Sequence, residues 1–169
     1  MAVLQEMDDL ETARAAVARA LERLSAAGAR DELLASLVHR RLRGDSFVVV
    51  ERVWRLGVLL LGRSGTLYAT GTTFRIDELR FDNHQSNLAA ARRGYRAAAL
   101  RAGFPPGETV NFDAKPIELD AALAGSDGPL ILGPQGIQVR WSPTSDVLAP
   151  FESYLDERTE LLADPPGGA

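Results

Sequence analysis

The sequence contains no cysteine, so disulfide bonds, thiolate metal sites and cysteine-based catalysis are excluded. It also lacks any apolar run near the roughly 20 residues that a membrane-spanning helix needs. Its first residues are acidic and do not have the basic and then apolar order of a secretory signal. We therefore expect a soluble cytoplasmic protein without a membrane partner, and we expect no cofactor and no bound metal.

Lysine is nearly absent: Lys115 is the only lysine among 19 basic residues, and all the others are arginines. Together with the abundant alanine, this usage fits a GC-rich coding genome better than a phosphate-binding task, although arginine binds phosphates well. The net charge of −4 argues against a general polyanion binder. Nucleic-acid binding through Arg92, Arg93 and Arg96 is accordingly the last of three functional hypotheses.

The most β-prone stretch is 47–76, and we expect the fold to be organised around it. Three short apolar runs, at 47–50, 57–61 and 67–74, are rich in β-branched and aromatic residues. Residues 62–65, Gly-Arg-Ser-Gly, suit a tight turn because glycine reaches positive φ without steric cost. This pattern predicts a three-stranded antiparallel meander at the centre of the sheet.

Residues 1–44 predict a helical hairpin that covers the sheet. Apolar residues recur seven apart over 3–24, which is typical of a helix that buries a stripe on its own domain or on a partner helix. Gly28 is suited to end this helix, and Asp31 is suited to cap a second helix that runs to Leu42. The sequence does not decide whether the first helix packs on its own domain or on the matching helix of a homodimer.

The remaining sequence predicts an α+β core over 45–163 and a disordered tail over 164–169, within one domain. We expect a mainly antiparallel sheet, made of the meander and a second hairpin, that is covered by helices. Helical spacing, capping residues and turn signals give the expected elements. These are a helix at 86–102, a strand at 108–112, a loop at 113–116, a short helix at 117–124, a hairpin at 129–141 and a helix at 150–162.

Most catalytic templates are missing from the sequence. It has no G-x-x-x-x-G-K-[ST], no G-x-G-x-x-G, no G-x-S-x-G and no H-E-x-x-H. One polar cluster nevertheless suggests a ligand site, because His84 precedes a predicted helix start that could help to hold an anion. Arg92 and Arg93 follow about two helical turns later. Polar residues of this kind more often form a solvent-exposed connection between two elements than a ligand site.

A second polar cluster completes the candidate ligand site. Glu108, Asn111, Asp113 and Lys115 lie within eight residues of one another. A desolvated lysine could serve as a base or as a Schiff-base amine. A lysine beside an aspartate in a polar loop is more often exposed and ordinary.

Several short segments distributed along the chain are distinctive enough for comparison with other proteins. They are WRLGVLLL from Trp54, LYATG from Leu67, RGY from Arg93, GFPPGETV from Gly103, VRWS from Val139, YLDER from Tyr154 and PPG from Pro165. With these segments the chain resembles a family of short uncharacterised proteins from high-GC bacteria, over roughly residue 48 to the C-terminus. The shared motifs look like core and turn residues.

Members of this family are sometimes labelled glutaminase, which implies an amidohydrolase activity. Serine-dependent glutaminases need a Ser-x-x-Lys pair, in which the lysine helps to activate the serine. Here the residue three positions before Lys115 is Phe112, so the resemblance carries no glutaminase residue over to this chain.

The first functional hypothesis is a cytoplasmic, non-catalytic module that binds a protein partner, or itself as a homodimer. It would use the N-terminal hairpin or an exposed sheet edge. The alternative is a small-molecule-binding protein or an amidohydrolase that uses the loops around His84 and over 111–115. Whether the chain is an enzyme stays open.

Overall fold

The computed structural model describes residues 1–77, 87–142, 144 and 146–167, and it has an α+β fold. Within these residues three α-helices accompany a seven-stranded sheet of order β5-β6-β1-β2-β3-β4-β7 and a three-stranded sheet of order β10-β9-β8. The larger sheet is mostly antiparallel, with β1 and β6 as a parallel pair. The predicted class and the predominance of antiparallel pairing are confirmed. None of the described helices is long and apolar enough to cross a membrane.

Contacts divide the chain into two compact units, each with its own apolar core. The residues predicted as one N-terminal hairpin, 1–44, are shared between them. Unit 1 comprises Met1–Asp31, Trp54–Ala69 and Pro116–Ala169, and unit 2 comprises Glu32–Val53 and Thr70–Lys115.

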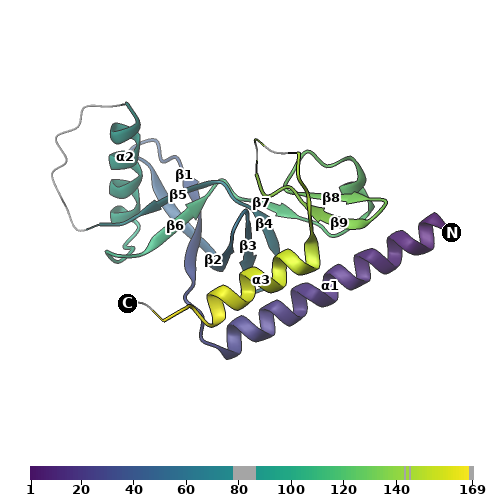
Figure 1. Cartoon of the computed structure of the whole chain (residues 1–169). Helices are drawn as coiled ribbons and strands as arrows, with labels where there is room; N and C mark the ends of the chain where they lie inside the picture. The colour runs from purple at the N-terminus through teal and green to yellow at the C-terminus, as the bar shows by residue number, and fades with distance from the viewer. Residues whose placement is uncertain (78–86, 143, 145, 168–169) are drawn as a thin grey trace. The chain divides into compact units, whose positions relative to one another are not determined.

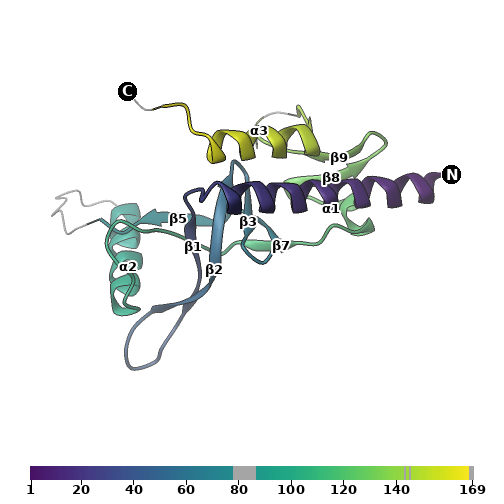
Figure 2. The same ribbon diagram turned by 90° about the horizontal axis from the view of Figure 1, so that it is seen from below.

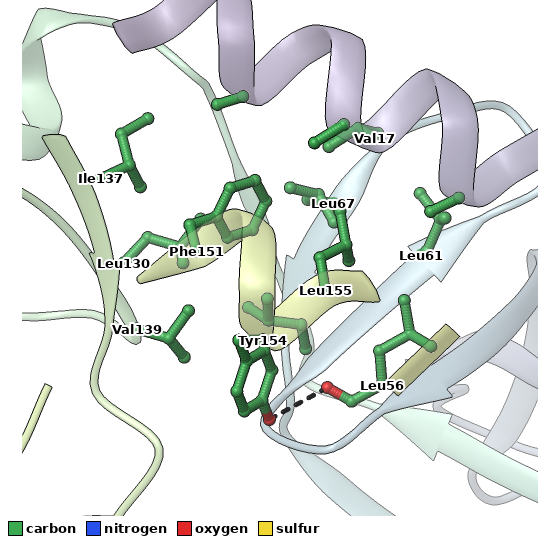
Figure 3. Packing of buried hydrophobic residues seen from close by; sticks show 14 of the residues in the cluster. Val17, Leu56, Leu61, Leu67, Leu130, Ile137, Val139, Phe151, Tyr154 and Leu155 are labelled. Carbon is green, nitrogen blue, oxygen red and sulfur yellow. Dashed lines mark hydrogen bonds between the residues drawn. The ribbon is translucent and has the colours of Figure 1, made fainter. Parts of the chain in front are cut away.

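Unit 1 is built on two helices that lie side by side, α1 (Ala2–Ala26) and α3 (Phe151–Ala163) (Figures 1 and 2). Figure 3 shows Val17 of α1, Ile137 of β9 and Phe151 of α3 among the side chains of its core. The other elements are short: β3 (Leu59–Gly62), β4 (Leu67–Ala69), β7 (Lys115–Ile117), the 3-10 helix η1 (Ala121–Gly125), β8 (Leu130–Gly133), β9 (Gly136–Val139) and β10 (Ala149–Pro150).

Unit 2 packs α2 (Asn87–Arg101) against a group of strands with an aromatic core. The Phe112 ring lies 4.8 Å from that of Tyr95 and 5.2 Å from that of Phe47, centroid to centroid, in edge-to-face arrangements that aromatic pairs favour. Ala98 and Ala99 are fully buried, and their small size lets α2 approach this core closely. The strands are β1 (Glu32–Val38), β5 (Thr72–Arg75), β6 (Thr109–Phe112) and the part of β2 (Ser46–Leu56) up to Val53.

The prediction of a second N-terminal helix over 31–42 is wrong, because Glu32–Val38 is strand β1. This strand pairs antiparallel with β2 and parallel with β6. Leu33, Leu34 and Ala35 are all buried, so both faces of the strand are covered there. A strand buried on both faces gives a continuous apolar run, which periodicity alone does not distinguish from a helix. The predicted helical hairpin therefore contains one helix, α1.

The third strand predicted for the meander, 67–74, is in fact two strands. β4 pairs with β3, whereas β5 pairs antiparallel with β6, and the chain divides at Gly71. A Cβ atom on Gly71 would lie 2.3 Å from the backbone oxygen of Phe112, so the approach of these two segments requires glycine. β2, β3 and β4 are neighbours in that order in the larger sheet.

Smaller differences concern the segment after β6. Lys115–Ile117, predicted as the end of a loop and the start of a helix, is strand β7, and η1 begins only at Ala121. The helices expected at 3–24, 86–102 and 150–162 correspond to α1, α2 and α3, and β8 pairs with β9 as the second hairpin. The expected capping residue Ser86 and the tail residues 168–169 lie outside the described residues.

Candidate functional site

Asn111, a predicted ligand residue, is only 1% exposed, in the middle of unit 2. Its side-chain amide donates to Glu32 Oε2 at 2.7 Å and to the backbone oxygen of Leu33 at 3.3 Å. Its Oδ1 atom accepts a hydrogen bond from Thr73 Oγ1 at 2.9 Å. These bonds join β6 to both neighbouring strands, β1 and β5. Because its donors and its acceptor are occupied, Asn111 acts as a cross-link within the sheet.

Arg92 and Arg93 do not share a site with Asn111. Both arginines are exposed on α2. Val110 and Phe112 belong to the core on the α2 side of the sheet, and side chains alternate along a strand, so Asn111 points to the opposite face.

Asp113 and Lys115 follow β6 on the surface, and both side chains are exposed. The hypothesis of a catalytic lysine required a desolvated amine, and the Lys115 side chain is exposed. Asp113 has a φ of 57°, a left-handed conformation that aspartate tolerates better than most residues. His84 lies outside the described residues. The structure therefore does not bring Asn111 together with Arg92 and Arg93.

The N-terminal part of α1 carries large apolar side chains that are exposed. Val3 is 68% exposed, Leu4 67% and Met7 53%. Val3 and Met7 continue, at helical spacing, the stripe that Leu10 and Val17 bury in unit 1. Figures 1 and 2 both show this end of α1 extending beyond β8 and β9. The apolar stripe of α1 therefore begins outside the core of unit 1, and only its later part covers that core.

The same part of α1 is acidic. Glu6, Asp8 and Glu11 are exposed, Asp9 is half-buried, and the first basic residue of the helix is Arg14. Apolar side chains among carboxylates are complementary to a surface that is both apolar and basic. We refer to Val3, Leu4 and Met7 together with these four acidic residues as the acidic face of α1.

A cavity of about 170 Å³ opens beside the acidic face, within unit 1. It lies between α1, the turn that joins β8 to β9, and the first turn of α3. Ala13, Ile137 and Phe151 supply apolar lining, and Asp9 and Glu152 supply carboxylates.

The lining of this cavity suits binding of an apolar group with a positive charge beside it. Asp9 accepts a hydrogen bond from Gln5, and Glu152 lies 3.6 Å from Arg19 in an exposed ion pair of the kind that contributes little. Both carboxylates can therefore exchange their present contact for a better one. Across the described part of the chain, no group of three His, Cys, Asp or Glu side chains could hold a metal ion.

A second exposed feature, loop 39–45 between β1 and β2, was missed by sequence reasoning. Leu42 is 98% exposed, and Arg40, Arg41 and Arg43 beside it are exposed as well. The signal was present, since one leucine among three arginines precedes a Gly-Asp pair, and Gly44 takes a φ of 72°. The wrong assignment of 31–42 to a helix concealed it.

Comparison with known proteins identifies no relative that would assign these surfaces. No family model, no curated protein and no solved structure matches the chain.

Proposed function

We propose that this protein is a self-association module, in which the acidic face of α1 binds a second copy of the chain. The observation that carries the proposal is the exposed continuation of a buried stripe at Val3 and Met7, with Leu4 exposed next to Met7 on the same turn. A contiguous apolar surface with a polar rim is typical of a protein interaction site.

The apolar side chains alone would give weak association. Full burial of a side chain of this size contributes about 1.5–3 kcal/mol, and this is an upper limit here because each is already partly buried. Association costs an estimated 4–15 kcal/mol in lost rigid-body freedom. Complementary charges are therefore needed to give useful affinity and orientation.

The charges indicate which part of the second copy is bound. Two acidic faces brought together would place carboxylates against carboxylates, which is unfavourable. Loop 39–45 has the required opposite character, because it exposes one leucine among three arginines. The chain thus carries both an acidic and a basic apolar surface, and a second copy can supply the missing partner.

Other parts of the interpretation stay predictions. These are the cytoplasmic location, the relation to short proteins from high-GC bacteria, and the lack of catalysis. Buried, hydrogen-bonded Asn111 and exposed Lys115 give the small-molecule alternative no support. Ammonia released from glutamine at a rate that scales with protein concentration would contradict the non-catalytic reading.

The proposal is tested by sedimentation velocity over a range of concentrations. We expect the mass to rise above the 18.3 kDa of one chain as concentration increases. The variant Val3→Ser/Leu4→Ser/Met7→Ser should stay at the mass of one chain. The matched control Leu88→Ser/Leu100→Ser/Leu161→Ser removes three other exposed apolar side chains, and should associate like the unmodified protein.

A protein that remains a monomer up to about 1 mM, where a binding free energy of only about −4 kcal/mol would be visible, overturns the proposal. Equal association by the α1 variant and the unmodified protein would also overturn it. Circular dichroism of each variant establishes that the fold is retained.

A further inference from the structure

We infer that the contact between copies is made by loop 39–45 of one copy, which docks in the cavity beside the acidic face of α1 of another. This inference rests on the proposed function and specifies its partner surface. Leu42 enters the cavity, and the neighbouring arginines pair with the carboxylates around it.

The loop is held at its base and free at its tip. His39 Nδ1 lies 2.8 Å from Asp45 Oδ1, which closes the loop across its two ends. Arg101 of α2 donates from Nε and Nη2 to the backbone oxygen of Asp45, at 3.0 and 2.8 Å. A loop that is already ordered loses less conformational entropy when it binds.

The tip has no partner within its own chain, as far as the described residues extend. Arg40, Arg41 and Arg43 are exposed, and the structure records no hydrogen bond or ion pair for their guanidinium groups. Leu42 stands between them at 98% exposure, where it gains nothing from folding. Figure 2 shows that the loop lies at the end of the paired strands β1 and β2, which present it to solvent. A tip of this kind is well placed for a concave partner.

The cavity matches the tip in size and in charge. Cavities of about 150 Å³ hold a ligand as large as benzene, so about 170 Å³ accommodates one leucine side chain. Ala13 and Phe151 are almost fully buried and form an apolar floor. Asp9 and Glu152 line the same cavity, so an inserted leucine would place its neighbouring arginines near two carboxylates. Arginine pairs with carboxylates in a two-pronged geometry that fixes orientation as well as adding affinity.

The basic surface of α2 is a poorer match for the same cavity. Arg92 and Arg93 are exposed on α2 with no large apolar side chain between them, and Arg96 is already paired with Asp77 at 3.5 Å. This surface therefore serves as the matched control, because reversing its charge changes the net charge without touching the loop.

The docking and receiving surfaces are different parts of the chain, so two complementary variants can be made. The loop variant is Arg40→Glu/Leu42→Ser/Arg43→Glu, and the cavity variant is Asp9→Lys/Glu152→Lys. Each keeps one of the two surfaces intact. If the loop of one copy docks in the cavity of the next, each variant alone is a monomer, whereas their equimolar mixture forms a complex of twice the 18.3 kDa chain mass and no larger.

Sedimentation velocity of each variant and of the mixture measures these masses. Recovery of association in the mixture also shows that both variants are folded. The control Arg92→Glu/Arg93→Glu should assemble as the unmodified protein does. Loss of assembly in that control would instead indicate a general charge effect and overturn the inference.

Other outcomes separate this inference from the proposed function. If the loop variant assembles normally while Val3→Ser/Leu4→Ser/Met7→Ser does not, the inference fails and the proposed function stands. Two variants that are folded by circular dichroism but stay monomeric when mixed also overturn the inference. An unmodified protein that is monomeric throughout overturns both.

Discussion

One buried hydroxyl joins the turn between β2 and β3 to helix α3, and substitution of Gly57 should reveal its contribution to stability. Tyr154 Oη accepts a hydrogen bond from the Val58 amide at 3.0 Å and donates one to the Leu56 backbone oxygen at 3.2 Å (Figure 3). The turn passes through Gly57 with a φ of 68°. A Cβ atom there would lie 1.9 Å from Tyr154 Oη and 3.1 Å from its Cζ. The tyrosine must therefore move if Gly57 becomes alanine.

The size of the effect follows from these contacts. Tyr154→Phe leaves the Val58 amide and the Leu56 oxygen without their partner, which costs about 1–3 kcal/mol. Gly57→Ala costs about 1–2 kcal/mol for the left-handed backbone, and the displaced tyrosine loses the same two hydrogen bonds. In the Tyr154→Phe background these bonds are already absent. The double variant should therefore be about 1–3 kcal/mol more stable than the sum of the two single effects predicts.

Urea unfolding gives the free energy of unfolding of the unmodified protein, of Gly57→Ala, of Tyr154→Phe and of the double variant. The difference between the double variant and the sum of the single effects is the coupling energy. Gly28→Ala is the control, because Gly28 has a similar φ of 59° but open space around its Cβ position. Gly28→Ala should lower the free energy of unfolding only by the cost of the left-handed backbone. The decrease should be the same whether residue 154 is tyrosine or phenylalanine. Single effects that add to within about 0.5 kcal/mol would refute the contact between Gly57 and the tyrosine hydroxyl.

Three further predictions concern stability and exposure. Asn111→Ala should lower the free energy of unfolding by about 2–3 kcal/mol in urea, and Asn111→Asp by more, because a second carboxylate would face Glu32. Gly71→Ala should lower the free energy of unfolding by about 3 kcal/mol, which is seen as a lower midpoint of thermal unfolding. Its Cβ would lie 2.3–2.5 Å from backbone atoms of Phe112 in β6 and of the following residue. Trp54 is 1% exposed and Trp141 46%, so acrylamide should quench the fluorescence of Trp54→Phe strongly and that of Trp141→Phe weakly.

The sequence predicted correctly those elements whose structure is decided by residues close together in the chain. α1 and α3 repeat apolar residues at helical spacing, and β8 and β9 flank a turn of Gly-Pro-Gln-Gly. In each case the residues that decide the structure lie within one element or next to it. The predicted and observed positions of these elements therefore agree to within a few residues.

The errors arose where distant segments decide the structure. Leu33 is paired with Val110, which lies 77 positions further along the chain, and no local pattern announces that pairing. The break between β4 and β5 depends likewise on the closeness of Gly71 to the backbone of Phe112. Tertiary contacts of this kind override the local preference of leucine and alanine for helices.

The candidate site was predictable in part. The heptad-like spacing of Val3 and Met7 suggested a partner helix as one of two alternatives, and both side chains prove to be exposed. The cavity was beyond prediction, because it joins Ala13 to Ile137 and Phe151 from distant parts of the sequence. Asn111 was singled out as a ligand because it is polar, but its burial and its hydrogen bonds to two neighbouring strands give it a structural role.

The distribution of charge, rather than its total, connects the composition to the proposed function. A net charge of −4 describes an unremarkable acidic protein, yet four carboxylates gather on the first turns of α1 and three arginines on loop 39–45. The net negative charge opposes nucleic acid as a partner, whereas the three arginines of one copy and the four carboxylates of another are locally complementary. Because the charges are exposed, salt screens them over about 10 Å at 0.1 M. Association through this contact should therefore weaken as salt is added, whereas a purely apolar contact would hold or strengthen.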